Sequence, residues 1–136
     1  MDILFDRHLE YLSDVPTEFT RGLMNTIDWD SRLVMIRGPK GVGKSTLMQQ
    51  YVLKNYEPTD RHILYCSADT AYFSNHTLID TASEFVKKGG KVLLIDEIHK
   101  YENWSREIKE IYDLYKGLKV ILSGSSLIQL NDGQAD

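Results

Sequence analysis

The most constraining feature of this sequence is an alternation of short β-rich runs with segments of helical periodicity. Four runs are rich in branched apolar residues, at residues 33–37, 62–66, 92–96 and 120–123. The last two are almost continuously apolar, as is typical of strands buried on both faces of a parallel sheet. The alternation predicts an α/β fold in three layers, with a mostly parallel sheet and right-handed crossovers between its strands.

Apolar stripes with helical spacing predict the helices that connect these strands. The three stripes between the strands comprise Leu47, Met48, Tyr51 and Val52; Leu78, Ile79, Ala82, Phe85 and Val86; and Trp104, Ile108, Ile111, Tyr112 and Tyr115. Two further stripes precede the first strand, one with Phe5, Leu9 and Leu12 and one with Phe19, Leu23, Met24 and Ile27. We therefore expect residues 1–31 to form a helical segment ahead of a core at residues 32–126.

Composition narrows the class of protein. The chain has 136 residues, a net charge of -4 and one cysteine, Cys66, which cannot pair within the chain. This fits a reducing compartment, so a cytoplasmic location is expected. No apolar run approaches the ~20 residues of a membrane-spanning helix. The excess of acidic residues argues against a generally basic surface for nucleic acid, although it does not exclude a local patch.

A phosphate-loop motif follows the first strand directly. Its residues are Gly38, Pro39, Lys40, Gly41, Val42, Gly43, Lys44, Ser45 and Thr46. The glycines allow backbone amides to turn toward a phosphate, and the positive end of a helix beginning near Lys44 favours the same anion. Lys44 is expected to reach the β- and γ-phosphates, and the Ser45 hydroxyl to bind Mg²⁺. The alternative is a glycine-rich turn with an exposed lysine, which the position between strand and helix disfavours.

An acidic pair ends the third strand. A buried parallel strand at residues 92–96 would deliver Asp96 to the carboxyl edge of the sheet, beside the phosphate loop. Asp96 is then expected to hold Mg²⁺ and Glu97 to orient and deprotonate a water that attacks the γ-phosphate. The alternative is a solvated acidic pair, or one that caps the next helix.

Hydroxyl residues end the fourth strand, at Ser123 and Ser125. If this strand lies between the first and third, Ser123 is placed to sense the γ-phosphate or the attacking water, with Ser125 as the second choice. An ordinary Ser/Gly loop is an equally good interpretation. His99 and Lys100 are interpreted as a solvated pair, and Trp104 as a core residue.

Together, residues 38–46, the segment from Leu93 to Trp104 and residues 121–126 resemble the AAA-type P-loop ATPases of bacteria and archaea that carry a C-terminal restriction-endonuclease-like domain. The resemblance covers about residues 7–130. It implies ATP and Mg²⁺ as ligands, ATP hydrolysis, and a sheet of order 2-3-4-1 in which the sensor strand is inserted between the phosphate-loop strand and the acid strand.

The resemblance also implies a continuation beyond this sequence. Members of that group have a fifth strand, a helical lid and a further domain after the loop at residues 124–126. We therefore expect a single, truncated ATPase domain at residues 1–136, lacking the fifth strand, with a protein or nucleic-acid partner engaged through the absent domain. An uncovered first strand predicts self-association of the chain.

Three functional interpretations remain open at this point. The first is an Mg²⁺-dependent ATPase whose hydrolysis drives a conformational change in an attached domain or partner. The second is a nucleotide-binding switch or scaffold with negligible turnover, and the third is a small-molecule kinase. The position of Glu97 favours a water nucleophile over a substrate hydroxyl.

Overall fold

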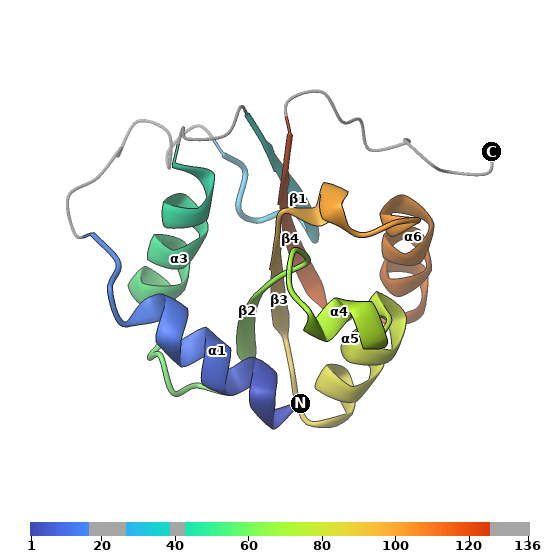
Figure 1. The fold of residues 1–136 in the computed structure, drawn as a ribbon, viewed down its shortest axis with the longest axis horizontal. Coiled ribbons are helices and arrows are strands. Elements are labelled where there is room, and N and C mark those ends of the chain that lie inside the picture. Colours follow the sequence, from blue (N-terminus) through green and yellow to red (C-terminus); the bar gives the residue numbers. More distant parts are fainter. Residues whose placement is uncertain (17–26, 39–42, 126–136) are drawn as a thin grey trace.

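A four-stranded parallel sheet forms the centre of the molecule in a computed structural model that describes residues 1–16, 27–38 and 43–125 (Figure 1). The strands are β1 (Leu33–Arg37), β2 (Ile63–Ser67), β3 (Val92–Asp96) and β4 (Lys119–Gly124). Their spatial order is β1-β4-β3-β2, with every neighbouring pair parallel. This is the predicted order 2-3-4-1 read from the other edge, so the insertion of the last strand between the first and third is confirmed.

Helices connect the strands as the periodicity predicts. The helices are α1 (Asp2–Leu12), α3 (Lys44–Asn55), the short α4 (Tyr72–Asn75), α5 (Leu78–Lys87) and α6 (Trp104–Leu114), with a 3₁₀ turn, η1, at Ile98–Lys100. Helix α3 lies on one side of the sheet and α5 and α6 on the other, while α1 crosses the edge of the sheet at β2 (Figure 1). Within the described ranges, no helix combines the length and hydropathy needed to cross a membrane.

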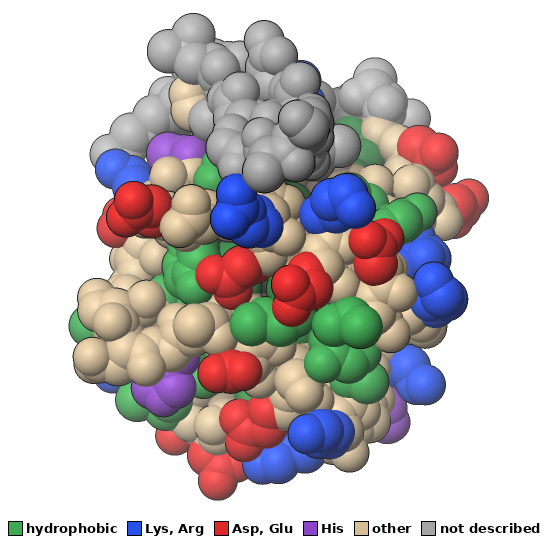
Figure 2. All heavy atoms as spheres, turned by 90° about the vertical axis from the view of Figure 1, so that its right-hand side faces the viewer, with side chains coloured by type: hydrophobic (Ala, Val, Ile, Leu, Met, Phe, Trp, Pro, Cys, Tyr) green, Lys and Arg blue, Asp and Glu red, His purple; other side chains and the backbone are tan. Residues whose placement is uncertain are grey.

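Each strand contributes side chains to two hydrophobic cores, one on each side of the sheet. In β2, Leu64 belongs to the core beneath α5 and α6, whereas Ile63 and Tyr65 belong to the core beneath α3. All five residues of β3 are buried. Because successive side chains of a strand point to opposite faces, a run that is apolar at every position fits a strand covered on both sides. On the outer surface over α5 and α6, acidic and basic side chains are interspersed with smaller hydrophobic areas (Figure 2).

Helix α1 covers the outer edge of β2. It contributes Phe5 to the cluster on one side of the sheet and Leu12 to the cluster on the other. Between them, the fully buried His8 accepts a hydrogen bond at Nδ1 from the backbone N–H of Tyr65, at 2.9 Å. Its Nε2 lies 3.1 Å from the carbonyl oxygen of Pro58. The backbone N–H of Tyr65 lies on the edge of the sheet, where no further strand among the described residues supplies an acceptor. The imidazole of His8 supplies that acceptor instead.

Most differences from the predicted elements are small. β2 begins and ends one residue later than predicted, and β4 extends one residue further at each end. Two residues predicted to lie on buried stripes are exposed: Tyr112 of α6 is 38% exposed, and Leu9 of the first helix is 41% exposed. The helix is rotated so that His8 faces the sheet edge, which turns Leu9 outward. The second helix predicted before β1 falls mainly on residues 17–26, outside the described residues.

We predict that His8 makes the fold less stable in mild acid. Burial lowers the pKa of His8, because the charged ring is poorly solvated and its Nδ1 must stay unprotonated to accept from Tyr65. The unfolded chain, with a histidine pKa near 6.5, therefore binds more protons, and the free energy of unfolding falls as the pH drops below about 6.5. The slope for this group is at most about 1.4 kcal/mol per pH unit.

Urea unfolding of the wild type and of His8→Gln at pH 7.5 and 5.5 measures this effect. The variant is expected to be less stable at pH 7.5 and to lose less stability than the wild type on acidification. Equal pH dependence in the two proteins would show that His8 does not carry the effect.

Candidate functional site

The candidate site lies where the carboxyl ends of β1, β4 and β3 meet. Strand order brings these ends together, and the backbone N–H of Gly38, directly after β1, donates to the carbonyl oxygen of Gly124 at 3.4 Å. The phosphate-loop motif therefore begins beside the tip of β4. Clefts at the carboxyl edge of a parallel sheet are where ligands bind in folds of this type.

The end of the phosphate-loop motif forms the start of α3. Gly43 precedes the helix with φ +89°, a left-handed conformation that glycine adopts without steric cost. Lys44 is the first helical residue, is 7% exposed, and donates from Nζ to the carbonyl oxygen of Gly38 at 2.6 Å. The motif thus folds back on itself so that its lysine reaches its first residue. Pro39, Lys40, Gly41 and Val42 lie outside the described residues.

Asp96 is the centre of a buried hydrogen-bond network. Asp96 as a whole residue is 3% exposed. Oδ1 accepts from the Ser123 hydroxyl and from the backbone N–H of Glu97, the latter at 3.0 Å, while Oδ2 accepts from the Tyr65 hydroxyl at 2.5 Å. Donors from β2 and β4 therefore hold a carboxylate that stands at the end of the strand between them. A buried carboxylate needs such donors to offset its loss of hydration.

Tyr65 is a site residue that the sequence analysis treated only as part of an apolar strand. Its hydroxyl also accepts from Gln49 Nε2 of α3 at 3.1 Å. Burial raises the pKa of Tyr65, as do the charge and hydrogen bond of Asp96, with hydrogen bonds from Gln49 and Ser45 acting in the opposite direction. The phenol therefore stays protonated and donates to Asp96. The one available signal was a tyrosine inside a buried strand, whose hydroxyl requires a partner.

Glu97 leaves β3 in an unusual backbone conformation. With φ 56° and ψ 44°, it lies in the left-handed region, which is costly for a residue with a Cβ. Its backbone N–H donates to Ser123 Oγ as well as to Asp96 Oδ1, each at 3.0 Å. Its side chain is 29% exposed. Backbone strain maintained by surrounding hydrogen bonds is concentrated at functional sites.

The two candidate sensor residues, one in β4 and one just after it, are placed differently. Ser123 is fully buried, with its hydroxyl between Asp96 and the backbone of Glu97. Ser125 contacts the same segment through its backbone N–H, which donates to His99 Nδ1 at 3.3 Å. The interpretation of His99 as a solvated loop residue is wrong, because its ring is 25% exposed and bridges two segments.

The oxygen atoms at this edge fit an Mg²⁺ ion. Asp96 offers a carboxylate and Ser45, near the Tyr65 hydroxyl, offers a hydroxyl; both are hard oxygen ligands of the kind Mg²⁺ binds. Among the described residues, no group of three or more His, Cys, Asp or Glu side chains could hold a metal ion. In proteins, Mg²⁺ is often held by one or two carboxylates, by water and by substrate phosphates.

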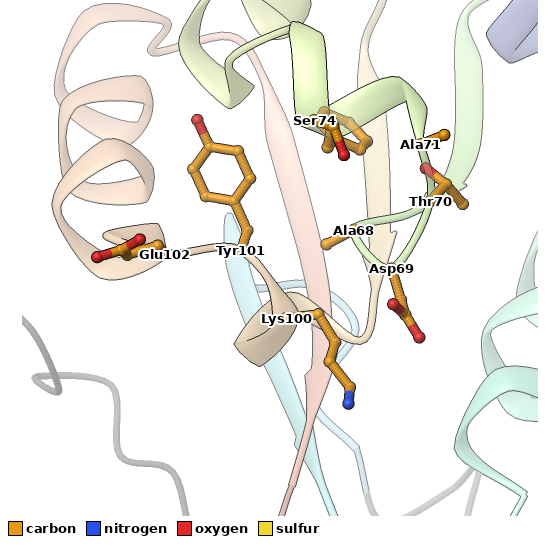
Figure 3. A pocket seen from close by; sticks show the side chains of 9 residues that line it. Ala68, Asp69, Thr70, Ala71, Ser74, Lys100, Tyr101 and Glu102 are labelled. Atoms are coloured by element: carbon orange, nitrogen blue, oxygen red, sulfur yellow. The ribbon is translucent and has the colours of Figure 1, made fainter.

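Other features at this edge do not belong to the motif. Cys66 is buried, and its pKa is raised to about 12 by burial and by the charge of Asp96, so the thiol is unreactive. An open pocket of about 490 Å³ lies between the loop after β2 and the turn that ends η1 (Figure 3). Asp69 and Lys100 line it, but no motif residue does.

Comparison with known proteins identifies the family to which the chain belongs. The Chromosomal replication initiator protein DnaA of two strains of Treponema pallidum is 33% identical over 92 residues. The match covers 62% of this chain and 19% of each relative, so the chain spans about a fifth of the length of these relatives. The AAA domain family matches residues 30–136, which include the phosphate-loop motif, Asp96, Glu97 and Ser123. The chain belongs to the AAA domain family.

Proposed function

We propose that this protein binds ATP together with Mg²⁺ and hydrolyses it to ADP and phosphate. The observation that carries the proposal is the shared edge at which the phosphate-loop motif and the Asp96 network meet. Gly38 is hydrogen-bonded to Gly124, and Ser123, the residue before Gly124, is hydrogen-bonded to Asp96. Membership in the AAA domain family supports the choice of ATP as ligand.

Binding would depend on the start of α3. Lys44 is held close to the backbone of the motif by its bond to Gly38, and a phosphate group would replace that carbonyl as its partner. Ser45 and Asp96 would hold Mg²⁺, which offsets the negative charge of the phosphates. Because both carboxylate oxygens of Asp96 already accept hydrogen bonds, we propose that Asp96 acts on the ion through bound water.

The chemical step would use Glu97. A water O–H bond breaks as its proton moves to the Glu97 carboxylate, the water oxygen bonds to the γ-phosphorus, and the bond to the ADP oxygen breaks. The left-handed backbone conformation of Glu97 and the hydrogen bond from its N–H to Ser123 fix the position of the backbone from which the carboxylate side chain extends. Ser123 is then proposed as the residue that couples the tip of β4 to the acidic pair.

Hydrolysis is proposed to drive a conformational change in an attached domain or a partner. This part rests on the resemblance to AAA-type ATPases with a C-terminal restriction-endonuclease-like domain, and a cytoplasmic location fits it. The name of the Treponema pallidum relatives, a chromosomal replication initiator, makes nucleic acid one candidate for such a partner. A nucleotide-binding switch and a small-molecule kinase are the alternatives that the measurements below separate.

Self-association is expected at the first strand. β1 pairs with β4 alone among the described residues, whereas α1 covers part of the opposite edge at β2. An uncovered strand edge pairs readily with another strand. Light scattering over a concentration series should therefore show particles larger than one chain. A strictly monomeric protein at all concentrations would contradict this expectation.

Replacement of Lys44 should weaken binding of Mg-ATP. A charge-assisted contact of about 1.5 to 3 kcal/mol corresponds to a loss of about 10- to 150-fold in affinity for Lys44→Ala, measured by calorimetry. Lys54→Ala, which removes an exposed lysine from the other end of α3, should bind as the wild type does. Equal affinity of the wild type and Lys44→Ala would exclude Lys44 as a phosphate ligand.

Replacement of Glu97 should affect turnover and not binding. Glu97→Gln keeps the size of the side chain but removes the base, so phosphate release under saturating Mg-ATP should fall by about 100-fold or more. Glu102→Gln changes an exposed glutamate of the same segment and should have little effect. Full activity of Glu97→Gln would exclude Glu97 as the base, and a wild type that binds but does not hydrolyse would favour the switch.

A further inference from the structure

His99 joins two parts of the site that its position in the sequence does not connect. It lies in η1, just after β3, and is bonded through Nδ1 to the backbone N–H of Ser125 at the end of β4, at 3.3 Å. The other ring nitrogen, Nε2, lies 3.3 Å from Glu97 Oε2. One imidazole therefore bridges the tip of β4 and the carboxylate that is proposed to activate water.

The partner at Ser125 determines which nitrogen carries the proton. A backbone N–H can only donate, so Nδ1 must be unprotonated to accept from it. In the neutral ring the proton is then on Nε2, the nitrogen that faces Glu97. The ring is oriented as a donor toward the carboxylate. At 3.3 Å this contact is long for a hydrogen bond, as contacts of catalytic groups often are before substrate binds.

We infer that His99 is a positioning residue for Glu97, an inference that rests on the function proposed above. By holding Oε2, the Nε2–H of His99 leaves Oε1 as the oxygen that takes the proton from water. By accepting from Ser125, the same ring ties the direction of the carboxylate to the tip of β4. Ser123 and Ser125 thus act on Glu97 at both ends, one on its backbone N–H and the other through His99.

Two substitutions separate the two bonds of the ring. His99→Gln places an amide donor near the position of Nε2 but offers no acceptor at the position of Nδ1. His99→Asn places an acceptor near Nδ1 but cannot reach Glu97. We expect kcat for ATP hydrolysis to fall by about tenfold or more in His99→Asn and by less than about threefold in His99→Gln, because misplacement of a catalytic group by about 1 Å can cost up to about 100-fold. KM for Mg-ATP should change by less than about threefold in both variants.

The matched control is His76→Gln, which makes the same substitution at an exposed histidine that bonds the carbonyl oxygen of Tyr72. It should hydrolyse ATP as the wild type does. If His99 only supports the loop through Ser125, the order reverses, so that the Asn variant stays active and the Gln variant does not. This reversed order of kcat would overturn the inference. So would equal losses of kcat in the two His99 variants, an unchanged kcat in both, or a change confined to KM.

The ring nitrogens provide a measurement that does not depend on activity. In ¹⁵N NMR spectra at neutral pH, His99 should show an unprotonated Nδ1 and a protonated Nε2, and Glu97→Gln should shift the Nε2–H resonance of His99 without affecting that of His76. A proton on Nδ1 would overturn the inference. If the wild type hydrolyses no ATP, the function proposed above fails, and these resonances alone decide whether His99 bridges Glu97 and Ser125.

Discussion

The buried carboxylate of Asp96 is the constraint on which the arrangement of this site depends. A carboxyl group in a residue that is only 3% exposed needs hydrogen-bond partners from the protein, because water cannot supply them. Those donors come from β2, through Tyr65, and from β4, through Ser123. The network can form only if both strands flank β3, so the hydrogen bonding of Asp96 depends on the order of the sheet.

Much of the fold could be predicted from the sequence, because several short sequence patterns each require a particular position in the sheet. Continuous apolar runs, the Gly-Lys-Ser sequence at residues 43–45 and the acidic pair after β3 are local signals, and each requires a particular place in a parallel sheet. The strands and the start of α3 at Lys44 follow from them, whereas the central position of β4 was implied by the resemblance to AAA-type ATPases. The roles of the site residues remain predictions, which the geometry supports but does not test.

Tyr65, His8 and His99 could not be assigned in this way, because their roles come from contacts between distant segments. His8 and Tyr65 are 57 residues apart in the sequence, and Tyr65 and Asp96 are 31 apart. No periodicity indicates that a histidine will cover a strand edge or that a strand tyrosine will face an acid. The error at Leu9 has the same origin, since the orientation of α1 depends on the bond between His8 and β2.

The tip of β4 is where these long-range contacts converge on the proposed chemistry. Gly124 accepts from the first residue of the phosphate-loop motif, Ser123 bonds Asp96 and the backbone of Glu97, and Ser125 bonds His99. A small movement of this tip would therefore act on the phosphate loop and on the acidic pair together. Hydrogen bonds that share partners in this way can strengthen one another. In the function proposed above, β4 would connect the phosphates of a bound nucleotide to the position of Glu97.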